Sequence, residues 1–228
     1  MVVEYTTNSG FLDRDVAALI RDNAGELTSL GGNLLNAARG KDVRTILVTS
    51  SHPGEGKSVA AISIANTLAN HIRSRVALLD ANFYAPRLHE LFHLQSEPGL
   101  ADVLIEGLPY QQALYGTDQE NLRVIPTGTA LASTIGRHEV GALKGTLTAL
   151  LEEFDYVIVD CCHFFDSSDV SLFASLFDGI ILVIECEKTN WEVVQQVNDN
   201  LKNVGGQVLG AVLNKRRYYI PRKLYGKI

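Results

Sequence analysis

The sequence of 228 residues has few of the residues that define several protein classes. It contains three cysteines, two of them adjacent, which excludes the disulfide framework of small secreted domains. Six prolines and nineteen glycines are too few for a disordered or collagen-like chain. No apolar run approaches the roughly 20 residues that cross a bilayer, and the N-terminus lacks the basic and then apolar layout of a signal peptide. We therefore expect a folded protein of the reducing cytoplasm.

An excess of basic residues is also absent. Twenty Lys and Arg against twenty-six Asp and Glu give a net charge of −6, which argues against a protein that coats nucleic acid. The last fourteen residues nevertheless contain six basic side chains and no acidic one. The sequence predicts an acidic body with a basic tail. That tail either meets a phosphate, an acidic protein face or an anionic lipid surface, or is simply a solvated terminus.

Short apolar runs alternate with helical patterns along most of the chain. Strands that are apolar throughout and alternate with helices are typical of a parallel sheet covered on both faces, so the predicted fold class is α/β. The expected strands are residues 45–49, 76–79, 122–125, 156–159, 179–184 and 208–213. The expected helices are residues 58–70, 86–93, 99–106, 140–153, 169–177 and 191–203, preceded by one or two amphipathic helices in residues 13–39 that are interrupted around Gly31 and Gly32.

The most informative stretch is SHPGEGKS, which begins at Ser51 between the first expected strand and its helix. Gly54 and Gly56 let the backbone wrap closely around a triphosphate. Lys57 would neutralise the β- and γ-phosphates, and Ser58 would place its hydroxyl on Mg²⁺. The strict G-x-x-x-x-G-K-[ST] pattern is broken where Ser51 replaces glycine. A Gly-rich turn with an exposed lysine is the alternative, but the order of strand, loop and helix favours a nucleotide site.

Polar residues end three of the expected strands. Asp80 and Asp160 each directly follow an apolar run, at the strand end where open α/β sheets bind ligands. Asp160 would hold the Mg²⁺ shell, and Asp80 could polarise the attacking group. Either aspartate alone is equally typical of a helix cap or turn. Asn214 ends the last run and is predicted to contact the nucleotide base through its amide.

Several segments of the sequence resemble one known family. These are ILVTSSHPGEGKSVAAISIANTLAN, VALLDANFYAPRLHELFHLQSEPGLADVL, FDYVIVD, GIILVIE and GAVLN. They are similar to the bacterial tyrosine autokinases of capsule and exopolysaccharide export, within the deviant phosphate-loop (P-loop) ATPases that include MinD and ParA. The resemblance covers about residues 26–214. Ser51 and His52 stand where MinD and ParA have a lysine, which favours the autokinase branch.

The resemblance implies a P-loop fold in three parts. Residues 1–42 are an N-terminal helical extension, residues 43–214 the ATPase or kinase core, and residues 215–228 a basic tail. ATP or ADP and Mg²⁺ are the implied cofactors. The implied nucleotide-binding residues are Pro53, Gly54, Glu55, Gly56, Lys57, Ser58, Val59 and Asn214. The implied metal ligands are Ser58, Asp80 and Asp160, and the implied catalytic residues are Lys57, Asp80 and Asp160.

The chain departs from the family pattern in three places. Asn82 stands where the family usually has a second aspartate, so a carboxylate that would bind Mg²⁺ or accept a proton is missing. Residues 26–33 lack the arginines that pack subunits of the family into a ring. The phosphorylated tyrosine cluster of the family is reduced to Tyr218, Tyr219 and Tyr225, which are expected phosphoacceptors or alternatively packing anchors.

The function expected from these observations is an Mg·ATP-dependent protein-tyrosine autokinase of exopolysaccharide or capsule biosynthesis. Its expected partner is a membrane polysaccharide co-polymerase at the inner face of the membrane, with self-association and contact through the basic tail also open. Two alternatives remain, namely an ATPase switch without kinase activity and a nucleotide-binding scaffold. Cys161 and Cys162 are expected in the core rather than at a metal, and Trp191 is expected to be a packing residue.

Overall fold

The computed structural model describes residues 6–37, 42–129, 137–165 and 168–216. Its strands are β1 (Thr6–Gly10), β2 (Thr45–Ser50), β3 (Val76–Ala81), β4 (Tyr115–Thr117), β5 (Leu122–Ile125), β6 (Tyr156–Cys161), β7 (Gly179–Glu185) and β8 (Val208–Asn214). Its α-helices are α1 (Arg14–Asp22), α2 (Ala24–Ala37), α3 (Lys57–His71), α4 (Leu88–Leu91), α5 (Leu100–Ile105), α6 (Arg137–Glu153), α7 (Asp169–Phe173) and α8 (Trp191–Asn203). Two 3₁₀ turns, η1 (Tyr110–Ala113) and η3 (Ala174–Leu176), complete the described elements.

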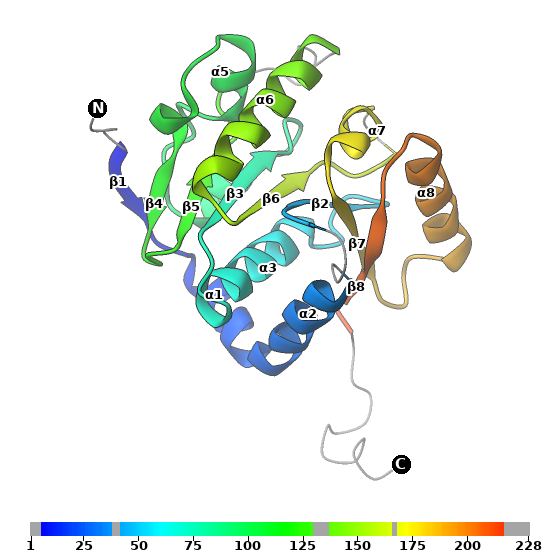
Figure 1. Cartoon of the computed structure of the whole chain (residues 1–228). Helices are drawn as coiled ribbons and strands as arrows, with labels where there is room; N and C mark the ends of the chain where they lie inside the picture. The colour runs from blue at the N-terminus through cyan, green and yellow to red at the C-terminus, as the bar shows by residue number, and fades with distance from the viewer. Residues whose placement is uncertain (1–5, 38–41, 130–136, 166–167, 217–228) are drawn as a thin grey trace.

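All eight strands form one sheet in the order β1-β4-β5-β3-β6-β2-β7-β8 (Figure 1). The β4–β5 pair is antiparallel, and the other neighbouring pairs are parallel. The strands β3, β6 and β2 lie side by side at the centre, so their carboxyl ends meet at one edge of the sheet. This edge is where an open parallel sheet binds its ligands.

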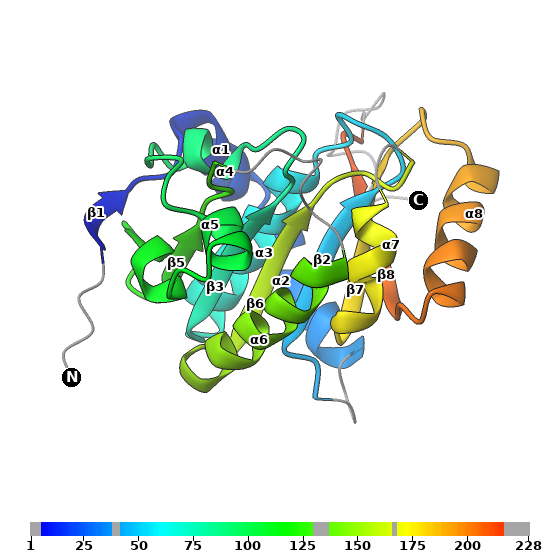
Figure 2. The same cartoon turned by 90° about the horizontal axis from the view of Figure 1, so that it is seen from above.

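The central strands are buried on both faces, which explains why their sequences are apolar throughout. On β2, Ile46 and Val48 point into one apolar cluster and Leu47 into the other, as the alternation of a strand requires. Helices α1 to α4 contribute to the first cluster, and α5 to α8 contribute to the second. In Figure 2, α5 and α6 lie in front of the strands on the second face. The α/β class and the two covered faces predicted from the sequence are confirmed.

All six expected strands are present, but two strands were not expected. β1 pairs with β4 at the edge of the sheet, so the first 42 residues are not only helical as predicted. Both strands are short, and β1 has the polar sequence TTNSG, which carries no apolar signal. Their pairing partners, rather than their own residues, define them as strands.

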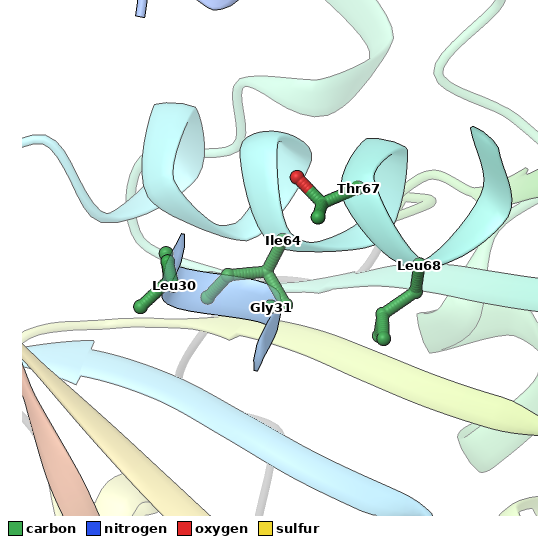
Figure 3. Close-up of a pocket in the computed structure, with 5 residues that line it drawn as sticks. All are labelled: Leu30, Gly31, Ile64, Thr67 and Leu68. Carbon is green, nitrogen blue, oxygen red and sulfur yellow. The ribbon is translucent and has the colours of Figure 1, made fainter. Parts of the chain in front are cut away.

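The expected break around Gly31 and Gly32 is wrong, because α2 runs through both glycines. The break between α1 and α2 falls at Asn23, which caps the end of α1. A Cβ atom on Gly31 would lie 2.8 Å from Cγ2 of Thr67, so the glycine lets α2 approach α3 closely. Figure 3 shows Leu30 and Gly31 of α2 against Ile64, Thr67 and Leu68 of α3. This apolar contact leaves no room for a water molecule and lies away from the predicted nucleotide site.

Trp191 is not the packing residue that we expected, since its side chain is 71% exposed. The buried stripe of α8 consists of Val194, Val197 and Leu201. Trp191 continues the spacing of that stripe but stands on the first turn, where no described element covers it. In contrast, Cys161 and Cys162 are buried as predicted.

Candidate functional site

The predicted phosphate loop joins the end of β2 to the first turn of α3. Gly54 and Gly56 have φ angles of 79° and 93°, a left-handed conformation that favours glycine. A Cβ atom at Gly56 would also collide with the side-chain amide of Asn214. The loop therefore needs both glycines for its course around the N-terminus of α3, whose backbone N–H groups and dipole favour an anion.

Lys57 is the first residue of α3, and its side chain is only 7% exposed. Within the described residues, its ammonium has no hydrogen bond and no ion pair. A lysine that is buried this far is costly unless an anion pairs with its ammonium. The alternative of an exposed lysine on a turn is wrong, and the position of Lys57 fits a phosphate ligand.

Asp80 and Asp160 are fully buried and stand directly opposite each other in the β3–β6 register. Burial and the nearby Asp80 carboxylate raise the pKa of Asp160 to about 8, although the Ser58 hydroxyl and the Lys57 charge act in the opposite direction. In the described part of the chain, neither carboxylate oxygen of Asp160 has a partner with regular hydrogen-bond geometry. These oxygens are consequently available to a cation.

The Asp80 carboxylate is engaged differently. It accepts hydrogen bonds from the backbone N–H groups of Asn82, Arg87 and Leu88 at 3.1, 3.0 and 2.9 Å. Burial raises the pKa of Asp80, and these three bonds oppose the rise. Asp80 thus organises the turn that follows β3, in addition to facing Asp160.

Asn82 closes the same turn with its side-chain amide. Its Nδ2 donates to the carbonyl of Ala85 at 2.8 Å, and its Oδ1 accepts from the N–H of Ala85 at 3.3 Å. An aspartate could make only the second of these bonds. The residue that departs from the family pattern is therefore adapted to a local structural role.

Glu55 links the phosphate loop to the segment after β7. Its buried carboxylate accepts from the N–H of His52 at 2.8 Å, from the N–H of Glu185 at 3.4 Å and from the hydroxyl of Thr189. The side chain is used within the protein, so only the backbone of Glu55 can face a nucleotide. The sequence pattern did not distinguish these two roles.

Asn214 contacts the loop at the end of β8, where its Nδ2 donates to the carbonyl of Glu55 at 2.9 Å. Lys215, expected only as one charge of the basic tail, also reaches the loop. Its Nζ donates to the carbonyl of Gly54 at 2.6 Å and pairs with Glu185 at 3.2 Å. No sequence pattern indicated this contact.

The structure brings the predicted residues of the loop, both aspartates and Asn214 to one edge of the sheet. Pro53 is exposed and Val59 is half-buried at either end of the loop. The expected phosphoacceptors Tyr218, Tyr219 and Tyr225 lie outside the described residues.

Magnesium is the metal that this donor set fits. No cluster of three or more His, Cys, Asp or Glu side chains suited to a metal ion occurs in the described ranges. Mg²⁺ is commonly held by one or two carboxylates together with waters and phosphate oxygens. The unpartnered oxygens of Asp160 and the adjacent Ser58 hydroxyl provide such a partial set, which is complete only when a nucleotide is present.

None of the described helices is both long and apolar enough to span a membrane.

Several curated relatives and solved structures resemble the chain, among them two of each kind. The putative tyrosine-protein kinase CapB of Staphylococcus aureus is 27% identical over 183 residues, which cover 80% of each chain. The succinoglycan biosynthesis transport protein ExoP of Rhizobium meliloti is 30% identical over 182 residues, covering 77% of this chain and 23% of ExoP. The chimerical protein CapA2B2 superimposes with a TM-score of 0.81 at 23% identity, covering 92% of this chain and 94% of that structure. The septum site-determining protein MinD of Pyrococcus horikoshii, complexed with Mg-ADP, gives a TM-score of 0.63 at 23% identity, covering 79% and 74%.

These relatives confirm the resemblance to tyrosine kinases of capsule and exopolysaccharide synthesis, and the MinD structure confirms the P-loop fold. A family model described as an AAA domain matches residues 43–213, which include β2, the phosphate loop, both strand-end aspartates and nearly all of β8. The chain therefore belongs to the AAA domain family, whose fold and phosphate loop imply nucleotide binding.

Proposed function

We propose that the protein is an Mg·ATP-dependent protein-tyrosine kinase of exopolysaccharide or capsule biosynthesis. The observation that carries the proposal is that the largely buried Lys57 and the carboxyl group of Asp160, whose oxygens have no regular hydrogen bond in the described ranges, interact electrostatically at the N-terminus of α3. This arrangement offers a cation to the phosphate groups and carboxyl oxygens to Mg²⁺, whose charge favours loss of the Asp160 proton. The names of the curated relatives add the reaction class and the pathway.

The phosphate groups would lie on the backbone of Gly54 to Ser58, with the Lys57 ammonium against the β- and γ-phosphates. Ser58 and Asp160 would hold Mg²⁺, with Asp80 next to them in the register of the sheet. The metal, when bound, neutralises charge that develops on the transferred phosphoryl group. Asn214 would approach the nucleotide base from the end of β8.

Phosphoryl transfer breaks the bond between the γ-phosphorus and the oxygen of ADP and forms a bond to the tyrosine oxygen. The phenol proton must leave, and the Asp80 carboxylate is the proposed acceptor. Because Asp80 already accepts three backbone N–H groups, little acceptor capacity remains. We therefore expect slow transfer at this site.

The proposed acceptors are Tyr218, Tyr219 and Tyr225, whose basic neighbours would be attracted to a site loaded with phosphate. The proposed partner is a membrane polysaccharide co-polymerase, which would hold the kinase at the inner face of the membrane. The relative ExoP, named as a biosynthesis transport protein, supports a role beside export.

The test is incubation with ATP labelled at the γ-phosphate. Wild-type protein should become labelled on tyrosine, and Lys57→Met should abolish the label because the phosphates lose their buried cation. Lys144→Met, which removes an exposed lysine of α6, is the matched control and should keep the label. Absence of label on wild-type protein with confirmed bound nucleotide would contradict the kinase proposal.

A second candidate, an ATPase switch that signals through its assembly state, is favoured by Asn82. This residue closes a turn where the family has a carboxylate, and it leaves only Asp80 to take a proton. Phosphate release without labelled tyrosine would select this candidate.

A further inference from the structure

An aromatic pair joins the phosphate loop to the segment after β6, and neither of its two side chains has a part in the nucleotide site described above. The rings of His52 and Phe165 stack, with centroids 5.5 Å apart and an interplanar angle of 28°. Phe164 meets Phe165 edge to face at 5.6 Å and 87°. His52 is exposed, and Phe165 is 42% exposed. Ring surface thus faces solvent at the phosphate loop.

Hydrogen bonds hold the backbone of His52 and of Phe164, the neighbour of Phe165. The N–H of His52 donates to the Glu55 carboxylate at 2.8 Å, and its carbonyl accepts the Ser50 hydroxyl at 2.8 Å. The N–H of Phe164 donates to the carbonyl of Ser50 at 2.8 Å, and its ring packs against the core. Hydrogen bonds thus hold the backbone of His52 and of the residue before Phe165, which reduces the conformational entropy lost when a further ring binds.

The order of the strands separates this surface from the place of the nucleotide base. The phosphate loop follows β2, Asn214 ends β8, and Phe165 comes shortly after β6. Since β2 lies between β6 and the β7–β8 pair, the aromatic pair and Asn214 lie on opposite sides of the loop. In-line transfer places the attacking oxygen opposite the leaving ADP. A base bound toward Asn214 leaves the side of His52 and Phe165 to the acceptor.

We propose that the His52–Phe165 pair binds the phenol ring of the tyrosine acceptor and so selects tyrosine over aliphatic hydroxyls. The inference rests on the proposed kinase function and adds the element that recognises the substrate. A tyrosine ring stacked on this surface lies at the side of the loop that also holds Asp160, the penultimate residue of the strand that leads to Phe165. Serine and threonine have no ring and gain nothing from the surface.

The test measures binding without turnover. The full chain is saturated with Mg²⁺ and the non-hydrolysable analogue AMP-PNP, and a fluorescent peptide with the sequence of residues 215–228 is titrated by anisotropy. A second peptide carries leucine at all three tyrosine positions. Wild-type protein should bind the tyrosine peptide more tightly than the leucine peptide. Phe165→Leu should weaken binding of the tyrosine peptide about threefold to tenfold, and Phe165→Tyr should restore it.

The matched control is Phe11→Leu. Phe11 is also an exposed phenylalanine stacked on a histidine, His93, at 4.5 Å, but it lies next to the edge strand β1. This variant should leave peptide binding unchanged, and thermal melting verifies that all variants fold. AMP-PNP affinity should be the same in every variant.

Equal binding of both peptides to wild-type protein would overturn the inference, and so would unchanged peptide binding in Phe165→Leu. A loss of AMP-PNP affinity in Phe165→Leu would also overturn it, because the aromatic pair would then bind the nucleotide base. A failure of the proposed kinase function is distinguishable from a failure of this inference. Tyrosine-dependent peptide binding without any phosphorylated tyrosine would retain the surface and contradict the kinase.

Discussion

Two buried carboxylates at the ends of adjacent strands make stability depend on pH. Burial and the nearby Asp80 raise the pKa of Asp160 from 3.8 to about 8, so the folded state holds this proton more tightly than the unfolded state. The stabilisation is complete below about pH 4 and is lost as the pH rises toward about 8. Asp160→Asn removes the ionisable group.

We therefore expect the free energy of unfolding of the nucleotide-free protein to fall between pH 5 and pH 9 by more than about 1.4 kcal/mol, the equivalent of one pKa unit. Asp160→Asn should flatten this dependence, with Asp80 accounting for what remains. Urea unfolding at several pH values provides the measurement. If the free energy of unfolding changed equally with pH in wild-type protein and in Asp160→Asn, the raised pKa of Asp160 would be contradicted.

Asn82 allows a test of why the chain departs from its family. Asn82→Asp restores the missing carboxylate beside Asp80 and should raise the rate of Mg·ATP-dependent phosphoryl transfer, by about tenfold or more if it accepts the proton. The variant also loses the bond from Nδ2 to the Ala85 carbonyl, which costs on the order of 1 kcal/mol of stability. Single-turnover kinetics and urea unfolding measure the two effects. A slower reaction in Asn82→Asp would show that the missing carboxylate at position 82 does not limit the wild-type rate.

At the scale of elements, helix α2 carries two adjacent glycines with different neighbours. A Cβ atom at Gly32 meets nothing within 4 Å, whereas one at Gly31 meets Thr67 of α3 at 2.8 Å. Alanine has the higher helix propensity, so Gly32→Ala should stabilise the protein by about 0.5–1 kcal/mol. Gly31→Ala should be destabilising, because separating α2 from α3 costs about 1–3 kcal/mol.

Urea unfolding of the two variants compares them directly. The same stabilisation in both would show that α2 is not closely packed on α3. This contact matters because α3 carries Lys57 at its N-terminus, so α2 supports the helix that presents the phosphate site.

The elements that sequence predicts best are those whose own residues specify them. Strands such as β2 and β7 consist of apolar residues, and their burial alone identifies them. The elements it missed, β1 and β4, are defined by distant partners. The same distinction holds within the site. Glycine at positions 54 and 56 is required by the local course of the backbone, so a sequence pattern predicts it. The inward direction of the Glu55 carboxylate depends on hydrogen bonds from residues 130 or more positions away.

At the scale of the whole molecule, one edge of the sheet concentrates the chemistry. The carboxyl ends of β3, β6 and β2 bring two aspartates to a helix N-terminus that carries a buried lysine. The parallel order of the strands, which the alternation of strands and helices predicts, is what makes these residues neighbours. The turn role of Asn82 and the reach of Lys215 to Gly54 follow from side-chain geometry that no sequence pattern encodes.

Mass-spectrometric mapping of phosphotyrosine after incubation with Mg·ATP, alongside a phosphate-release assay, tests the kinase assignment most directly. We expect phosphate on Tyr218, Tyr219 or Tyr225 of the wild-type chain and none on Lys57→Met. Phosphate release from wild-type protein without any modified tyrosine would contradict it.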